Sequence, residues 1–202
     1  MGQMRLILST LLLGIFFGCS GPEQAQNLSP KEAFIDSLLN KMTLSEKIGQ
    51  MSQATGSFEF TGPITSDSST LELVRTGRLG SFLNVVGAER TREAQEMAVN
   101  GSRLGIPLIF GYDMIHGYAT TFPIPLGEAA CWDLDLIKRS AEITAIEAAA
   151  AGVHWNFAPM VDIARDPRWG RIMEGAGEDP WWGSKVAVAR VEGYQGDDLS
   201  ST

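Results

Sequence analysis

The sequence has few of the residues that build covalent or metal-based sites. Its two cysteines, Cys19 and Cys131, lie far apart in the chain, so no disulfide framework is expected. Its only two histidines, His116 and His154, belong to no H-E-x-x-H motif and accompany no cysteine pair. We therefore expect neither a metal site nor another cofactor.

The signature motifs of two large enzyme classes are also missing. The stretch "VVGAERTRE" at 85–93 has one glycine where a dinucleotide-binding fold needs G-x-G-x-x-G, and "GAGEDP" at 175–180 ends in proline. No G-x-S-x-G nucleophile elbow of a serine hydrolase occurs. A doubly wound nucleotide-binding domain is thus supported only by alternation of strands and helices.

Positive charge is scarce as well. The 202 residues carry a formal net charge of −8 with a pI near 4.8, and no cluster of Lys or Arg follows the N-terminus. This balance argues against a nucleic-acid partner and favours a neutral or cationic small ligand. The length and the 44% hydrophobic content suit one globular domain.

The N-terminus contains a targeting segment. An apolar run from Leu6 to Gly18 follows Arg5 and is shorter than the roughly 20 residues that span a bilayer. We interpret residues 1–18 as a signal peptide and residues 19–29 as a polar linker. The stretch "FFGCS" resembles the lipobox of bacterial lipoproteins, with Cys19 as the acylated residue. We expect a location in the periplasm or at the outer membrane, with membrane contact only through that anchor; simple secretion is the alternative.

Strand-like and helix-like segments alternate along the body. The predicted strands are 79–86, 106–113 and 153–159, and residues 56–70 are predicted to form a loop. Capping signals and apolar periodicity predict helices that begin at Pro30, Leu44, Thr91, Asp133 or Asp135, and Pro180 with Asp179 as its N-cap. Three strand–helix units without a tight hairpin indicate an α/β fold with a parallel sheet.

Polar residues gather just after two of these strands. Asp113 and His116 follow the second strand, and residues 162–178 form a polar loop after the third. Both (β/α) barrels and open α/β sheets place their sites at the carboxyl ends of strands. A functional site is therefore expected where these two segments meet.

The stretch "RDPRWGRIMEGAGEDPWW" at 165–182 combines carboxylates, arginines and tryptophans. Charged groups can hydrogen-bond sugar hydroxyls, and aromatic faces cover the apolar side of a pyranose ring. Taken singly, its charged residues are better explained as ion pairs that tie the loop together, and its tryptophans as helix packing. These residues are Arg165, Asp166, Arg168, Glu178, Trp181 and Trp182.

Several motifs in a fixed order carry a family resemblance. "YDMIHG" and "FPIPLG", then "FAPMVDIARDPRWGR" and "GEDP", resemble the family 3 glycoside hydrolases, especially exported bacterial β-glucosidases. The resemblance runs from about Leu44 to Gly196. It implies a (β/α)₈ TIM-type barrel, of which residues 30–202 would form an incomplete N-terminal part with about three βα units.

The same resemblance implies a substrate site. Asp113 would hold two hydroxyls of the terminal glucose of a small oligosaccharide or β-glucoside, and Arg171 would bind hydroxyls beside it. His116 is expected to support its loop. Met160 and Asp162 are expected to lie behind the residues that touch sugar.

The chain also departs from the family pattern. No lysine precedes a histidine, although family members have a sugar-binding Lys-His pair on the following strand. Their catalytic nucleophile and acid/base lie later still, so we expect both beyond Thr202. Asp67 in "ITSDSS" resembles the nucleophile's setting, but it precedes the first predicted barrel strand, and we treat it as a coincidence.

The resemblance implies a retaining β-glucosidase, whose two catalytic carboxyl groups would stand roughly 5 Å apart. The segment up to Thr202 alone is expected to be inactive, and to aggregate or stay partly unfolded because a partial barrel exposes strand edges. A non-catalytic sugar-binding lipoprotein that retains Asp113 and Arg171 is the alternative. The choice between glucoside and xyloside stays open.

Overall fold

The computed structural model describes residues 28–56 and 68–196 of the chain. The predicted signal peptide with Cys19, and Asp67, lie outside these residues. The chain divides into two compact units, residues 1–40 and 41–202. The described part of the first unit is essentially helix α1 (Pro30–Lys41), whose start is fixed by a reciprocal cap: Ser29 N donates to the Glu32 carboxylate at 2.8 Å, and Glu32 N donates to Ser29 Oγ at 3.3 Å.

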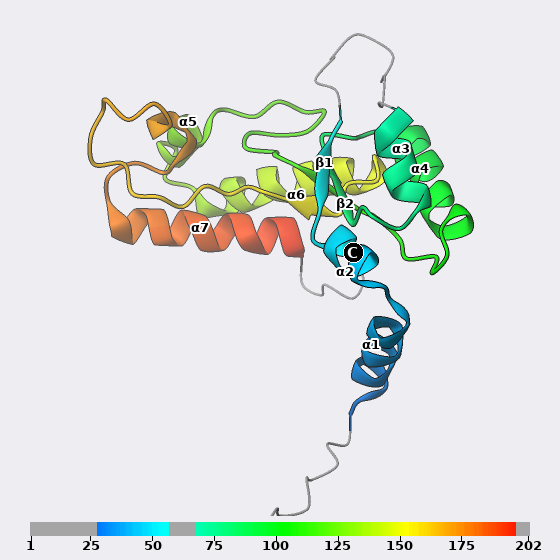
Figure 1. Cartoon of the computed structure of the whole chain (residues 1–202). Helices are drawn as coiled ribbons and strands as arrows, with labels where there is room; N and C mark the ends of the chain where they lie inside the picture. The colour runs from blue at the N-terminus through cyan, green and yellow to red at the C-terminus, as the bar shows by residue number, and fades with distance from the viewer. Residues whose placement is uncertain (1–27, 57–67, 197–202) are drawn as a thin grey trace, which may run out of the picture. The chain divides into compact units, whose positions relative to one another are not determined.

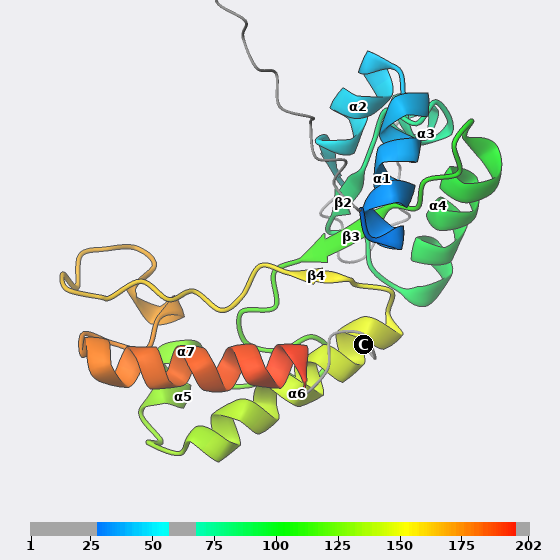
Figure 2. The same ribbon diagram turned by 90° about the horizontal axis from the view of Figure 1, so that it is seen from below.

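The second unit contains a four-stranded parallel sheet in the order β1-β2-β3-β4 (β1 and β2 in Figure 1, β2 to β4 in Figure 2). The strands are β1 (Gln53–Thr55), β2 (Ser81–Leu83), β3 (Ile109–Tyr112) and β4 (Trp155–Asn156). The helices are α2 (Leu44–Gln50), α3 (Ser68–Arg75), α4 (Ala88–Gly101), α5 (Pro125–Ala129), α6 (Leu134–Ala150), the 3₁₀ helix η1 (Ile172–Glu174) and α7 (Pro180–Gln195). None of the helices described is long and apolar enough to cross a membrane.

The predicted α/β fold with a parallel sheet is confirmed, but the count of three strand–helix units is wrong. The sheet has a fourth strand, β1, which pairs with β2 through Gln53 opposite Ser81. This strand is only three residues long and largely exposed, so it lacks the alternation of apolar residues on which the prediction depended. Helix α3 begins at Ser68, inside the stretch predicted as loop.

The helix starts were predicted well because local hydrogen bonds set them. Thr43 and Glu46 form the expected capping box of α2. The side chain of Asp133 caps α6, and that of Asp179 caps α7 with Pro180 at its first position. Helix α4 begins at Ala88, three residues before the predicted Thr91.

One hydrophobic core joins α3 and α4 to the sheet, and Figure 2 shows these two helices beside β2 and β3. Phe82 and Phe110 occupy paired positions on β2 and β3, and their rings stack with centroids 6.1 Å apart. The side chain of Gln95 on α4 reaches β3, where it accepts from Leu108 N at 2.7 Å and donates to Leu108 O at 3.1 Å. Apolar burial and these bonds hold the sheet in place.

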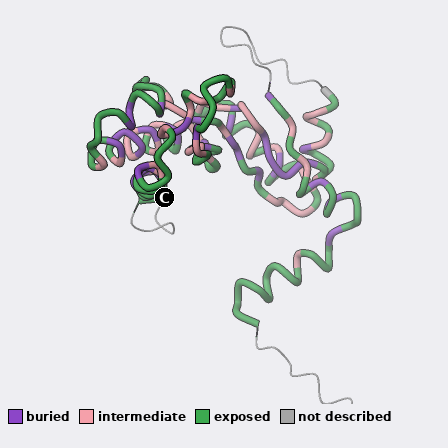
Figure 3. Tube along the Cα trace, turned by 90° about the vertical axis from the view of Figure 1, so that its left-hand side faces the viewer, coloured by how far each residue is buried: buried purple, intermediate pink, exposed green. Residues whose placement is uncertain are grey.

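A second core joins α5, α6 and α7. It contains Ile137 and Trp182, whose indole N–H donates to Ala129 O at 3.0 Å. Helices α6 and α7 run side by side (Figure 2), and Gly193 allows their close approach because a Cβ there would lie 2.4 Å from Lys138 O. Along these helices buried positions alternate with exposed ones, as expected for helices with one face in the core. Helix α1, by contrast, has no buried residue and is exposed along nearly its whole length (Figure 3).

Candidate functional site

Two segments leave the carboxyl ends of neighbouring strands and lead to the helices. We call residues 113–124, which connect β3 to α5, the β3 loop, and residues 157–179, which connect β4 to α7, the β4 loop. Strands β3 and β4 are adjacent and parallel, with Tyr112 opposite Asn156, so both loops start at the same edge of the sheet. The predicted site residues lie on these two loops.

Asp113 is the first residue of the β3 loop and is exposed. Its loop is tied to α6 by Glu147, whose carboxylate accepts from Ala119 N at 2.9 Å, and from Thr120 N at 2.8 Å and Thr120 Oγ1 at 2.6 Å. These bonds, chiefly the one from the Thr120 hydroxyl, lower the pKa of Glu147. Asp113 therefore projects from an anchored segment.

Arg171 is the N-cap residue of η1, directly before Ile172, and is exposed. Its guanidinium donates to both carboxylate oxygens of Glu174, with Nε 3.0 Å from each and Nη2 2.5 Å from Oε2. This hydrogen bonding, followed by the negative charge of Glu174, raises the pKa of Arg171; the charges of Asp113 and Asp162 act in the same direction. The charge of Asp113 thus acts on Arg171 from the other loop, and these are the two predicted sugar-binding residues.

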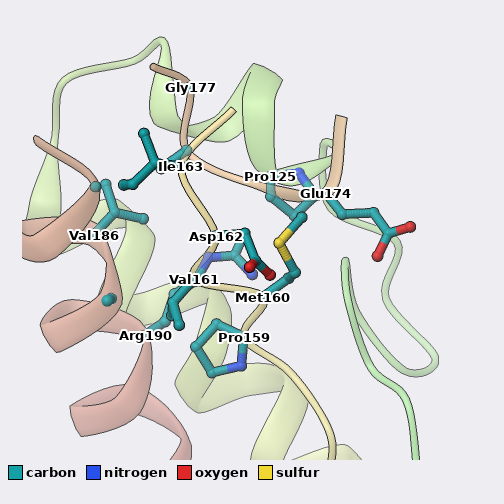
Figure 4. A pocket seen from close by; sticks show the side chains of 13 residues that line it. Pro125, Pro159, Met160, Val161, Asp162, Ile163, Glu174, Gly177, Val186 and Arg190 are labelled. Atoms are coloured by element: carbon teal, nitrogen blue, oxygen red, sulfur yellow. The ribbon is translucent and has the colours of Figure 1, made fainter. Parts of the chain in front are cut away.

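A small pocket lies beside the Arg171–Glu174 ion pair. Its walls come from the β4 loop, α5 and α7, and its volume is about 10 Å³, roughly that of one water molecule. Figure 4 shows Met160 and Asp162 at its centre and the Glu174 carboxylate pointing away from it. Asp113 and Arg171 are not in its lining, which does contain Glu174, the partner of Arg171. Met160 and Asp162 thus line a pocket that also contains Glu174, the ion-pair partner of Arg171.

The ion pairs expected within the β4 loop are present in part. Arg168 donates to the carboxylate of Asp166, with Nη2 2.5 Å from Oδ2. Of the two tryptophans expected to pack, Trp182 is buried, whereas Trp181 is 62% exposed. The Trp181 ring stacks on Trp182 with ring centroids 6.5 Å apart, and Lys185 Nζ lies 5.8 Å from its centroid. The packing interpretation is therefore wrong for most of the Trp181 ring, because its helix position faces solvent.

His116 is half-buried, and its buried Nδ1 has no hydrogen-bond partner among the residues described. Its backbone closes the loop, since Phe122 N donates to His116 O at 2.8 Å. Across 28–56 and 68–196, no three His, Cys, Asp or Glu side chains gather where they could hold a metal ion. The Asp113 carboxylate can accept hydrogen bonds from the hydroxyls of a polar ligand, and the Arg171 guanidinium can donate to them.

Three residues that hydrogen-bond to the β3 loop from other elements were not predicted from the sequence. Asn156 on β4, and Arg190 and Tyr194 on α7, all hydrogen-bond to its backbone. The sequence contained one indication of Arg190. It lies four residues after Val186 and eight after Trp182, and therefore on the apolar face of α7, where a charged residue is unusual. Nothing in the sequence indicated which backbone groups it would meet.

Comparison with known proteins adds a family to this geometry. The model of the glycosyl hydrolase family 3 N-terminal domain matches residues 43–202. The periplasmic β-glucosidase of Salmonella typhimurium is 40% identical over 166 residues, covering 82% of this chain and 21% of that protein. A β-xylosidase of Formosa agariphila is 32% identical over 197 residues, 95% of this chain and 22% of that protein.

Solved structures agree with the sequence relatives. The β-glucosidase of Listeria innocua in complex with glucose superposes with a TM-score of 0.71 at 41% identity, covering 82% of this chain and 24% of that one. The complex of the same enzyme with isofagomine gives the same TM-score and identity over 84% of this chain. The chain thus spans about a fifth to a quarter of the length of the relatives it matches.

Proposed function

The chain belongs to glycosyl hydrolase family 3, within its N-terminal TIM-barrel-type domain, and on this premise we propose that it supplies the sugar-binding part of a retaining β-glucosidase. The substrate would be the terminal non-reducing β-D-glucosyl residue of an oligosaccharide or β-glucoside. The relatives are β-glucosidases and a β-xylosidase, and one solved relative was crystallised with glucose.

One observation carries the proposal: Asp113 and Arg171 come from loops after adjacent parallel strands, yet the charge of Asp113 acts on Arg171. An ionised carboxylate accepts hydrogen bonds from sugar hydroxyls, and a guanidinium donates to them. Arg171 is bound to Glu174 only at the surface, so a sugar hydroxyl can compete for its donors. Asp162 would support this pair from the neighbouring pocket.

The chemistry requires two further carboxyl groups. Retaining hydrolysis needs a nucleophile and an acid/base residue roughly 5 Å apart across the glycosidic bond. We assign neither to the described residues and propose that both come from residues beyond Thr202. The chain would then bind and orient the sugar while the reacting groups are supplied from elsewhere in the protein.

The test is the hydrolysis of an aryl β-glucoside and an aryl β-xyloside by the product of the complete gene. We expect Asp113→Asn and Arg171→Ala each to lower kcat/KM by roughly 10- to 100-fold, since each removes a charged hydrogen-bond partner of the sugar. Arg168→Ala is the control, because Arg168 lies in the same loop but is 87% exposed and pairs with Asp166.

The results of these assays distinguish a β-glucosidase from a β-xylosidase and from a non-catalytic sugar-binding protein. Faster cleavage of the xyloside would favour the activity of the β-xylosidase relative. Binding of glucose without hydrolysis of either substrate would favour a non-catalytic sugar-binding lipoprotein. If Asp113→Asn or Arg171→Ala leaves kcat/KM within about twofold of wild type, the assignment of that residue is wrong.

We also propose that residues 1–18 are a signal peptide, that residues 19–29 form a linker to a barrel domain at 30–202, and that Cys19 carries a lipid. The periplasmic location in the name of one relative supports export. A lipid on Cys19 would hold the protein at a bacterial membrane facing the periplasm. Replacing Cys19 with Ser should then move the protein from the membrane fraction to the soluble one.

A further inference from the structure

The side chain of Asn156 joins the starts of the two site loops. Its Oδ1 accepts from Met114 N at 3.1 Å, directly after Asp113, and from Ala158 N at 3.0 Å, at the start of the β4 loop. Asn156 itself is held in β4, opposite Tyr112 of β3. A single oxygen atom thus fixes a backbone N–H in each loop.

Two residues of helix α7 also hydrogen-bond to the backbone directly after Asp113. Tyr194 donates its hydroxyl to Met114 O at 3.1 Å, and Arg190 Nη1 donates to Ile115 O at 3.1 Å. Met114 is therefore bonded through both its N–H and its carbonyl. Because the Asp113–Met114 peptide is planar, fixing the Met114 N–H also restricts the ψ angle of Asp113 and the direction of its side chain.

These bonds are part-buried, whereas Asp113 itself is exposed. Met114 is 3% and Arg190 4% exposed. Burial raises the pKa of the Tyr194 phenol, whereas the charge of Arg190 and the Asn156 amide act in the opposite direction, which places all three groups together. A hydrogen bond in such surroundings is stronger than one in water, and leaving its donor unpaired costs more.

We propose that Asn156 is a positioning residue for sugar binding: it aims Asp113 at the substrate, with Tyr194 and Arg190 as supports. This inference rests on the proposed function and adds to it a residue that touches no substrate. The same bonds could instead serve stability alone. The two roles differ in one respect, because a positioning residue matters only while Asp113 is present.

A double-mutant cycle in the product of the complete gene tests this difference. Asn156→Leu removes the acceptor at similar side-chain size, and Asn156→Asp retains an oxygen that can accept both N–H groups. Each is made in wild type and in Asp113→Ala, and kcat/KM is measured on the aryl β-glucoside. Asn100→Leu, the same change at an exposed position of α4, is the control.

We expect Asn156→Leu to lower kcat/KM by about tenfold in wild type and by less than about twofold in Asp113→Ala. Asn156→Asp should regain most of the loss, and Tyr194→Phe should lower kcat/KM by a smaller factor. Amide hydrogen exchange gives a readout independent of activity: residues 113–115 should exchange faster in Asn156→Leu while α4 is unchanged.

Equal losses in the two backgrounds, or unchanged exchange at 113–115 in Asn156→Leu, would overturn the positioning role. A different result would identify failure of the proposed function: Asp113→Ala would then hydrolyse the glucoside as fast as wild type, whatever residue stands at 156. The exchange measurement would in that case still report whether Asn156 fixes the loop, but the link to sugar binding would be refuted.

Discussion

The two loops of the site are held in opposite ways. The first residues of the β3 loop are fixed by partners 42, 75 and 80 residues away in the chain, on β4 and α7. The charged groups of the β4 loop bind neighbours: Arg168 pairs with Asp166 two residues away, and Arg171 with Glu174 three residues away. The former contacts are part-buried and the latter are at the surface.

This difference separates a rigid half of the site from an adjustable half. Asp113 has a direction set by the fold before any ligand arrives, which lowers the entropic cost of binding. Arg171 can exchange an exposed carboxylate for a ligand at little cost, because surface ion pairs contribute little to stability. The comparison predicts that changes behind the β3 loop cost stability, whereas changes within the β4 loop do not.

The largest effect is expected from Glu128→Gln. Glu128 on α5 pairs with Arg190 and accepts from Ser140, and Glu128 and Arg190 are only 8% and 4% exposed. Removing the carboxylate leaves the guanidinium buried without its partner charge, which costs about 3–5 kcal/mol. Urea unfolding of wild type and variant measures this loss.

A double replacement, Glu128→Leu with Arg190→Met, sharpens this prediction. Exchanging a whole buried pair for apolar residues is often neutral, so most of the stability should return. Hydrolysis of the aryl β-glucoside should not return with it, since the carbonyl of Ile115 still lacks its donor. If Glu128→Gln costs less than about 1 kcal/mol, the pair is not buried in solution.

The same contrast explains what the sequence could predict. The caps of α2, α6 and α7 depend on residues two or three positions apart, so they could be read directly from the chain. The parallel sheet followed from alternating strands and helices. Strand β1 could not be found this way, because it is defined by pairing with β2 and not by its own residues.

For the site, the sequence supplied the residue types and the loops, while the fold supplied their supports. Asp113 and Arg171 were predicted from a resemblance that depends on motifs, and the strand order brings their loops to one edge. The roles of Asn156 and Tyr194 depend on contacts across 42 and 80 residues, for which no local pattern exists. The pair Asp166–Arg168, by contrast, joins residues two positions apart, in a loop whose charged residues were expected to form ion pairs.

A smaller effect is expected from Gly193→Ala, which disturbs the helix that carries Arg190 and Tyr194. The new Cβ would lie 2.4 Å from Lys138 O and 2.7 Å from the Cβ of Ala141 on α6, so α7 must move outward. Overpacking of this kind costs about 1–3 kcal/mol in the free energy of unfolding. The shift should also lengthen the bonds to the β3 loop and lower kcat/KM.

Gly101→Ala is the matched control for that change. Gly101 is the last residue of α4, and a Cβ there would have no neighbour closer than Met97 Cγ at 3.9 Å. Replacing a helical glycine by alanine without a clash stabilises by up to about 1 kcal/mol. Equal destabilisation by the two variants would mean that the contact between α6 and α7 is looser in solution.

The smallest effect is expected from mild acid, and it should be larger at 165–175 in the β4 loop than at 113–115 in the β3 loop. The pKa values of Asp166 and Glu174 lie below their ordinary 3.8 and 4.5, chiefly because Arg168 and Arg171 donate hydrogen bonds to them. A carboxyl group with a lowered pKa stabilises fully above its ordinary value and loses that contribution as the pH falls through the lowered one. Neither the Asn156 amide nor the Tyr194 phenol titrates in this range. Below pH 4, the protection of backbone amides from exchange should therefore fall more across 165–175 than at 113–115. Glu174→Gln should remove much of the pH dependence around Arg171. Equal loss of amide protection in both segments would mean that the two loops are not held independently.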